Sequence, residues 1–325
     1  MGWFSMVDSR AYWLWLQGCL KPGSPLPLWV LENFPGGAEG FYQGGPKAWS
    51  SLPALSWADF GALGSFSLAE AQNRLSRAER AGWQVIVLGD KAYPAPLRHI
   101  YGPPAVLYVK GCLPDFSHLP AVAVVGSRRP IAQSAAVASR FGAQLAESGM
   151  IIVGGVAPGV DALVMASAIE KTDKLVCVLP VDLDSQYPVD TIPLRRRILE
   201  RGGALVTEHF SWPKPISGSF HLRNRLITGL CFGVVLIQAA MRSGTLMYAT
   251  LAAGQGRDVF VYPGPVESPE YLGTRMLLGE GAAPVYKGED VLAQCPIDFL
   301  NRMLQEYTQQ AAGAFGEAGP EREVE

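Results

Sequence analysis

Short apolar runs alternate with amphipathic stretches from residue 121 to residue 295. The run Ala121–Val125 is continuous and β-branched, which is typical of a strand buried on both faces of a sheet. The stretch Ala132–Glu147 has helical periodicity and is followed by Gly149, a common helix terminator. Further strand-like runs are Met150–Val153, Lys174–Leu179, Ala204–Thr207, Gly233–Gln238 and Asp258–Tyr262, and further helical stretches are Val160–Lys171, Leu194–Arg201, Asn224–Leu230 and Thr245–Gly254. This alternation predicts an α/β fold, Rossmann-like, with a mostly parallel sheet and helices on both faces.

The two ends of the chain differ from this region in composition and in the elements that they predict. The beginning is rich in Trp, Pro and Gly, and it predicts helices at Ser9–Leu20, Leu26–Phe34 and Ser67–Ala81, separated by the breaks Lys21-Pro22-Gly23, Pro35-Gly36-Gly37 and Gly44-Gly45-Pro46. Two short apolar runs, Val85–Leu88 and Ala105–Val109, lead into the main domain as strands. We therefore expect a small helical domain at 1–82, a Rossmann-like domain at 83–295, and a C-terminal helix (Ile297–Gln310) with an acidic, disordered tail at 296–325.

Charge and cysteine usage narrow the functional class. The net charge is −2, and the tail Glu317–Glu325 holds four Glu and one Arg, so the rest of the chain is close to neutral. Any nucleic-acid site must therefore be a local basic patch. Five scattered cysteines without a CxxC pair and four histidines without metal-ligand spacing predict reduced thiols, no metal and no cofactor. The N-terminus does not resemble a signal peptide and Tyr12–Leu20 is too short to span a bilayer, so we expect a cytoplasmic protein without a membrane partner.

The residues after each strand are the candidate ligand contacts, because the carboxyl ends of parallel strands share one edge of the sheet. They include Gly126-Ser127-Arg128-Arg129, Gly155 and Arg242-Ser243-Gly244-Thr245. We expect Gly126 and Ser127 to open the first helix with free backbone N–H groups, and Ser243-Gly244-Thr245 to do the same at a later helix. Helix N-termini and arginines both favour phosphate. Neither GxGxxG nor GxxxxGK[ST] is present, and a single Gly after a strand is often needed only for the turn.

The segment Phe220-His221-Leu222-Arg223-Asn224-Arg225 is the second informative cluster. An aromatic ring can stack a base while Arg223, Asn224 and Arg225 hold phosphate. The alternative is that Phe220 is a core residue and that Arg223 or Arg225 forms a buried ion pair. Lys214 lies in a Pro-rich loop, where it serves either as a further phosphate contact or as a solvated lysine.

Catalytic groups are not evident in the sequence. Ser127 and Ser243 lack an identifiable His/Asp pair. Asp161 and Glu208 follow strands and could act as an acid/base pair, but a helix cap for Asp161 and an ion pair of Glu208 with the Arg223/Arg225 cluster are the simpler interpretations. The basic run Arg195-Arg196-Arg197 with Arg201 either extends a DNA track or forms a solvated helix face. We expect no catalytic residue.

These motifs, in this order, resemble the DNA-processing protein A (DprA/Smf) family over about residues 80–295. The resemblance rests on Gly126-Ser127-Arg128, on Ala157-Pro158-Gly159-Val160-Asp161, on the series Phe220…Arg223-Asn224-Arg225…Gly229-Leu230, and on Ser243-Gly244-Thr245. It implies a non-enzymatic protein that binds and protects single-stranded DNA, forms a homodimer and assists loading of the RecA recombinase in natural transformation and recombination. It also implies that Arg128, Phe220, Arg223 and Arg225 contact DNA.

The chain departs from the family pattern at several positions. Gly154 stands where the family has Ser, Met165 where it usually has His, and Gln238 where it has Glu. The C-terminal tail is too short for the winged helix of many members. Two alternatives remain open: a nucleotide-processing enzyme similar to the LOG phosphoribohydrolases, whose PGGxGTxxE motif is only faintly echoed at Arg242–Thr245, and a module that senses a small nucleotide.

Overall fold

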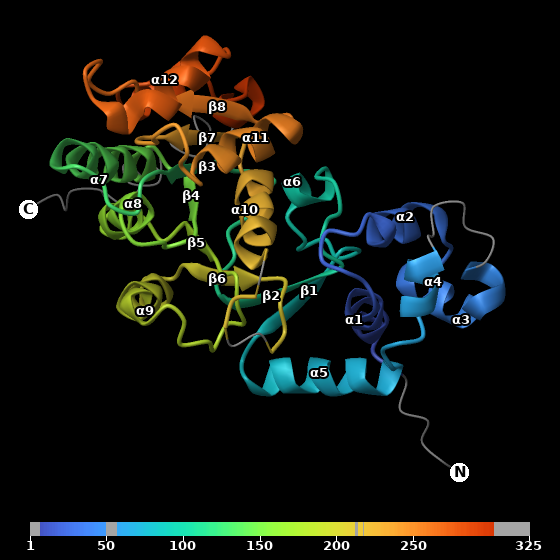
Figure 1. Ribbon diagram of the computed structural model, residues 1–325. Helices are drawn as coiled ribbons and strands as arrows, with labels where there is room; N and C mark the ends of the chain where they lie inside the picture. Colours follow the sequence, from blue (N-terminus) through green and yellow to red (C-terminus); the bar gives the residue numbers. More distant parts are fainter. Residues whose placement is uncertain (1–6, 50–56, 212–213, 217, 302–325) are drawn as a thin grey trace, which may run out of the picture.

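The protein is described by a computed structural model that covers residues 7–49, 57–211, 214–216 and 218–301 (Figure 1). Its strands are β1 (Gln84–Val87), β2 (Val106–Gly111), β3 (Ala121–Val125), β4 (Ile151–Gly154), β5 (Leu175–Val178), β6 (Ala204–Thr207), β7 (Gly233–Leu236), β8 (Asp258–Val261) and β9 (Ala283–Pro284). They form one sheet in the order β1-β2-β6-β5-β4-β3-β7-β8-β9. Strand β2 is antiparallel to both of its neighbours, and every other pair is parallel. The predicted α/β fold with a mostly parallel sheet is therefore confirmed.

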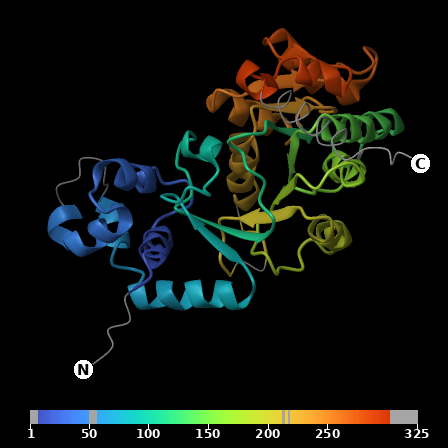
Figure 2. The same ribbon diagram turned by 180° about the vertical axis from the view of Figure 1, so that it is seen from behind.

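Helices cover both faces of the sheet, as the crossover rule requires. One face carries α7 (Ala132–Glu147), α8 (Val160–Ala168) and α9 (Ile192–Glu200), and the other carries α10 (Ser219–Leu230) and α11 (Leu246–Gly254), as Figures 1 and 2 show from opposite sides. The shorter elements around them are α6 (Ala95–Arg98), η1 (Val189–Thr191), η2 (Pro269–Tyr271), α12 (Leu272–Gly279) and α13 (Gly288–Leu292). Since both faces are covered, the strands β3 to β7 are buried at every position, which explains their continuous apolar runs.

The N-terminal part is helical, with α1 (Arg10–Cys19), α2 (Leu26–Asn33), α3 (Gly37–Trp49), α4 (Trp57–Ala62) and α5 (Leu68–Arg80). Its core is aromatic: the Trp15 ring stacks on Trp49 and meets Tyr42 edge-on. The expected break at Gly44-Gly45-Pro46 is present as a kink, because Gly45 has φ 60° and ψ −164° and separates two helical pieces within α3. The predicted helix Ile297–Gln310 is helical at residues 297–301, and its remainder and the acidic tail lie outside the described residues.

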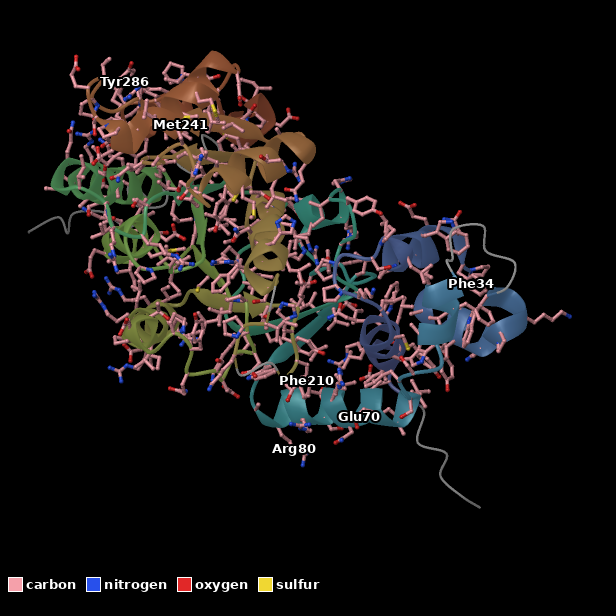
Figure 3. All side chains as sticks on the ribbon, in the orientation of Figure 1. Phe34, Glu70, Arg80, Phe210, Met241 and Tyr286 are labelled. Carbon is pink, nitrogen blue, oxygen red and sulfur yellow. The ribbon has the colours of Figure 1, made fainter. Side chains whose placement is uncertain are left out.

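The helical part packs directly against the first strands of the sheet. The amide of Gln17 on α1 spans two strands, since its Nε2 donates to the carbonyls of Val106 and Glu208 and its Oε1 accepts from the Val106 N–H. The Phe210 ring, which follows β6, lies beside α5, with the Arg77 guanidinium 5.0 Å from its centroid (Figure 3). These contacts fix the helical part beside β1, β2 and β6.

The chain order of the strands reverses at β3, and this reversal positions the candidate site. From β3 the chain runs outward through β4 and β5 to β6, then returns along α10 to β7 on the other side of β3. A crevice forms beyond the carboxyl ends of the strands at such a point, because the loops leaving the two neighbouring strands diverge.

Candidate nucleic-acid interface

A cleft of about 430 Å³ lies beyond the carboxyl ends of β3 and β7. Its walls come from the loop after β3, the start of α8, the first turns of α10 and the segment that enters α11. The lining residues are Gly126, Ser127, Arg128, Ala157, Asp161, Phe220, His221, Arg223, Asn224, Ser243, Gly244, Thr245, Met247 and Tyr248. Nine of the residues that the sequence predicted as ligand contacts are therefore brought together: Gly126, Ser127, Arg128, Phe220, Arg223, Asn224, Ser243, Gly244 and Thr245.

The ring of Phe220 is flanked by two cations. The Arg128 Cζ lies 5.5 Å from the ring centroid and the Arg223 Cζ lies 5.8 Å from it. Phe220 is partly exposed in the first turn of α10, so it is not a core residue. An aromatic face between two guanidinium groups offers a stacking surface next to sites for phosphate.

Arg223 is buried in the wall of the cleft, with 3% of its surface exposed. Its Nη1 donates to the Val178 carbonyl at 3.4 Å, and its Nε has no hydrogen-bond partner in the part of the chain that the structure describes. Within the described residues no carboxylate lies within 4.0 Å of this guanidinium, so its charge is not neutralised by a direct ion pair. Gly155 makes room for it, because a Cβ at that position would overlap the guanidinium. A buried cation without a close counter-ion favours an anionic ligand.

Asp161 is the one acidic residue among those that line the cleft. Burial raises the pKa of Asp161 to about 6, against the opposing influence of Arg223 and of hydrogen bonds from the backbone of Gly126 and Ala157. Asp161 therefore joins the loop after β3 to the loop after β4, which is a different role from the helix cap expected for it. The acid/base pair with Glu208, which was weighed as an alternative, finds no support in its position, because Glu208 does not line this cleft.

The two turns that were expected to present free N–H groups differ in structure. Helix α7 begins at Ala132, so Gly126 and Ser127 belong to a loop and do not open the helix. The Gly126 N–H is used by Asp161, and Ser127 Oγ accepts from the Arg129 N–H at 3.1 Å. The expectation of a helix N-terminus there was wrong, because the loop after β3 is several residues longer than a simple strand-to-helix turn.

The second turn does stand at a helix start. Thr245 is the residue before the first turn of α11, and its N–H donates to Ser243 Oγ at 3.2 Å. The Thr245 hydroxyl donates to the Gly126 carbonyl at 3.1 Å, which ties the loop after β7 to the loop after β3. The two predicted turns are thus held together as adjacent walls of one cleft.

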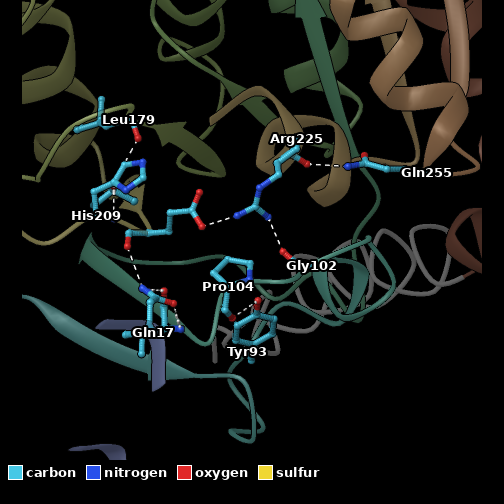
Figure 4. Close-up of polar contacts among 11 residues, drawn as sticks. Gln17, Tyr93, Gly102, Pro104, Leu179, His209, Arg225 and Gln255 are labelled. Carbon is cyan, nitrogen blue, oxygen red and sulfur yellow. Dashed lines mark hydrogen bonds and ion pairs between the residues drawn. The ribbon is translucent and has the colours of Figure 1, made fainter. Parts of the chain in front are cut away.

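Five predicted site residues do not line the cleft. Arg129, Arg242 and Lys214 are exposed on the surface, and Gly155 lies beneath Arg223. Arg225 is buried in an ion pair with Glu208, and its Nη1 donates to the Gly102 carbonyl at 2.8 Å (Figure 4). The ion pair that was weighed for the Arg223/Arg225 cluster thus exists, and Arg225 forms it.

The basic run on α9 is largely paired. Arg197 and Arg201 both contact Glu170, and Arg196 contacts Glu200 one turn away. Arg195 is buried and donates to the Ser185 carbonyl at 3.1 Å. These contacts fit a solvated, charge-balanced helix face better than a DNA track.

The structure adds lining residues that sequence reasoning did not select. His221 was part of the informative segment but was not chosen, and Met247 and Tyr248 were not considered. Closeness in the chain gave a usable signal, since Met247 and Tyr248 lie in the first turn of α11, just after the predicted Ser243-Gly244-Thr245 turn. Across the residues described by the structure, no cluster of three His, Cys, Asp or Glu side chains could hold a metal, and no helix is long and apolar enough to cross a membrane.

Comparison with known proteins gives a family match and close structural relatives. Residues 84–296 match the family model described as DNA recombination-mediator protein A. The DNA processing protein DprA of Bacillus subtilis is 32% identical over 222 residues, which cover 68% of this chain and 74% of that protein.

Two solved structures carry the same fold. The X-ray structure of DprA from Streptococcus pneumoniae superposes with a TM-score of 0.72 at 28% identity, covering 89% of this chain and 98% of that chain. The DprA of Helicobacter pylori, described for its unique single-stranded DNA binding mode, superposes with a TM-score of 0.57 at 29% identity, covering 65% of this chain and 94% of that chain.

Proposed function

The chain belongs to the DNA recombination-mediator protein A (DprA/Smf) family, and from this premise we propose that it binds single-stranded DNA in the cleft beyond β3 and β7. The observation that carries the proposal is the Phe220 ring between the guanidinium groups of Arg128 and Arg223. Bases stack on the ring and phosphates lie along the arginines. The Helicobacter pylori relative, described as binding single-stranded DNA, supports this choice of ligand.

The residues around the cleft define a path for the strand. Ser243, Gly244 and Thr245 present a helix start to a phosphate, and Arg242 and Arg129 extend the positive surface outside the cleft. Lys214 is exposed in the loop that precedes α10, where it can reach a strand leaving the site. We assign Gly155 an indirect role, because it positions Arg223.

The biological role follows from the family. The protein protects single-stranded DNA and assists loading of the RecA recombinase during DNA uptake and recombination. It acts as a homodimer in the cytoplasm and catalyses no reaction. In the proposed domain division, residues 1–82 form a helical domain, residues 83–295 bind DNA, and residues 296–325 form a C-terminal extension.

The test is binding of a fluorescent oligo-dT, beside the same sequence as a duplex, across a salt series. Arg128→Ala and Phe220→Ala each weaken binding to the single strand, the latter by roughly 1–3 kcal/mol for each base that loses its stacking partner. Arg128→Ala also lowers the salt dependence by about 0.7 in the log–log slope, the value for one phosphate contact on a single strand. Arg196→Ala is the matched control, because Arg196 is exposed on α9 and away from the cleft. Absence of binding at low salt, or equal binding by all variants, contradicts the proposal.

A nucleotide-processing enzyme is the second candidate, favoured by one observation. Asp161 is a buried carboxyl in a cleft that can hold a mononucleotide, and its raised pKa is a common property of catalytic acids. Its hydrogen bonds from two backbone N–H groups favour a structural role instead. Release of free base from a nucleoside monophosphate, lost in Asp161→Asn, would establish this candidate.

A further inference from the structure

Two polar side chains on α10 converge on one methionine in the wall of the cleft. His221 Nδ1 lies 3.0 Å from Met247 Sδ, and Asn224 Nδ2 lies 4.0 Å from the same sulfur. All three residues line the cleft. A thioether has no proton to give, so both nitrogens face it as donors.

This arrangement leaves the hydrogen-bonding capacity of Asn224 largely unused. Asn224 is only 7% exposed, and its amide nitrogen reaches only a weak acceptor at long range. Its Oδ1 has no hydrogen-bond partner among the residues that the structure describes. Buried polar groups normally find full partners. Two donors meet at one point of the cleft, and the same amide carries a buried acceptor that no described residue uses, which together indicate a place prepared for a polar group that the protein itself does not supply.

We propose that Asn224 and His221 recognise the edge of one base stacked on Phe220, that this base carries an oxo group, and that the Met247 sulfur occupies the position of that oxo group in the empty cleft. This inference rests on the proposed binding of single-stranded DNA and adds a base preference to it. The recognised class is a base with an oxo group beside an N–H, as in thymine or uracil.

Helix geometry supports a base edge over a phosphate at this point. Phe220 and Asn224 are four residues apart on α10 and therefore lie one above the other on the same face. A base that lies flat on the ring consequently brings its edge to the amide one turn further along. The amide donates to the oxo oxygen and accepts from the ring N–H, while His221 adds a second donor to the oxygen. Arg128 and Arg223 contact the phosphates, separately from this base contact.

Moving the Met247 side chain out of this position costs little free energy. Its side chain is flexible and 38% exposed, and a thioether is a poor acceptor. A ligand oxygen that takes its place gives both donors a stronger acceptor. The sulfur therefore fills the site when it is empty without competing strongly with a base.

The experiment compares fluorescent oligo-dU and oligo-dC of equal length, because the two bases have the same size and differ at this edge by an oxo or an amino group. We expect oligo-dU to bind about fivefold or more tightly, the low end of discrimination by one good base contact, and oligo-dT to bind like oligo-dU. His221→Ala and Asn224→Ala lower the ratio of the two affinities towards one. His221 is exposed, so its variant keeps the fold.

Four control variants separate base recognition from other losses. Asn73→Ala and His118→Ala replace exposed residues of the same types away from the cleft and leave the ratio unchanged. Arg128→Ala weakens both oligonucleotides and preserves the ratio. Met247→Ala binds oligo-dU at least as tightly as the unmodified protein, and weaker binding would show that Met247 is itself a contact.

The outcomes distinguish this inference from the proposed function. Equal affinity for oligo-dU and oligo-dC, a preference for oligo-dC, or a preference that survives both α10 substitutions overturns the inference and leaves single-strand binding intact. Failure to bind any oligonucleotide removes the proposed function itself.

Discussion

Replacing Arg225 by Ala tests which of the two arginines of the Arg-Asn-Arg segment serves the fold. Arg225 links three parts of the molecule, because it pairs with Glu208 after β6, donates to the Gly102 carbonyl and is held on α10 (Figure 4). Both members of the pair are buried, with side chains 8% and 3% exposed. The substitution therefore leaves a carboxylate in the interior without its counter-ion.

The expected loss is large because the Glu208 carboxylate has no second partner among the described residues. Its Oε1 accepts no hydrogen bond from any described residue, and its Oε2 contacts Arg225. Breaking a buried pair by removing one member costs about 3–5 kcal/mol, which corresponds to a fall in Tm of roughly 6–20 °C for a domain of this size. Burial already raises the pKa of Glu208 above its ordinary value. Without Arg225 the carboxyl takes up a proton more readily still, so the loss is greater at pH 8 than at pH 5.

Thermal unfolding and oligo-dT binding, measured on the same samples, separate the two roles. Arg225→Ala lowers Tm strongly, whereas at a temperature where the variant is folded its affinity for oligo-dT stays close to that of the unmodified protein. Arg128→Ala shows the reverse pattern, and Arg196→Ala changes neither, since its ion pair is exposed. The double variant Glu208→Leu/Arg225→Met recovers much of the stability, because an apolar pair of similar volume often replaces a buried ion pair without loss.

A particular pair of results would refute this reasoning. If Arg225→Ala kept its Tm within about 2 °C, which is the low end of the shift for 1 kcal/mol in a domain of this size, the ion pair would not stabilise the fold by the amount expected. If the variant also lost oligo-dT binding, Arg225 would be a DNA contact, as the sequence resemblance implies.

Two further substitutions probe the cleft. Gly155→Ala places a methyl group where the Arg223 guanidinium lies, so the arginine side chain must move away. The affinity for oligo-dT should then fall about as far as in Arg223→Ala. Unchanged affinity would show that Arg223 does not contact DNA. Asp161→Asn removes a carboxyl whose folded pKa of about 6 lies above its ordinary 3.8. Between these values the folded protein holds the proton more firmly than the unfolded chain, so this group makes stability decline as pH rises from 4 to 6 and level off above. The Asn variant should lose that component of the slope in Tm against pH, and an identical slope would contradict the assignment.

Most of the fold could be predicted because its strands are buried on both faces. The bounds of β3, α7 and β6 agree with the predicted Ala121–Val125, Ala132–Glu147 and Ala204–Thr207. Elements without a pattern were missed: α3 lies in a Gly-rich stretch, α6 has four residues and β9 has two. Elements as short as α6 and β9 carry too few apolar positions to show a period, and tertiary contacts determine them.

The sequence predicted most of the residues that form the site, but not the role of each residue. Phe220, Arg223 and Asn224 share one helix and face the cleft, as their spacing allows. Arg225 is two residues from Arg223, or about 200° around the helix, so the two guanidinium groups point away from each other. Helical spacing shows that they diverge, but only the structure shows that Arg225 is the one that meets Glu208.

Two departures from the family pattern form a single contact in the structure. Gly154 ends β4, and a Cβ at this position would lie 2.7 Å from Cε of Met165 on α8. The family has Ser and His at these positions, so we expect the two exchanges to compensate each other. Gly154→Ser alone forces Met165 to move, at about 1–3 kcal/mol, and Met165→Ala alone leaves a cavity, at about 2–5 kcal/mol.

In the double variant Gly154→Ser/Met165→Ala the serine side chain enters the space left by Met165. The loss in free energy of unfolding, measured in urea, should therefore be smaller than the sum of the two single losses by about 0.5 kcal/mol or more. Losses that add within about 0.3 kcal/mol would show that the two positions are independent. Coupling would mean that the changes at Gly154 and Met165 compensate each other within the core between β4 and α8. Gly155 is the next residue along the chain, and Arg223 depends on its backbone position. A compensated exchange at Gly154 therefore explains how this chain can depart from the family beside the cleft and still keep the guanidinium in place.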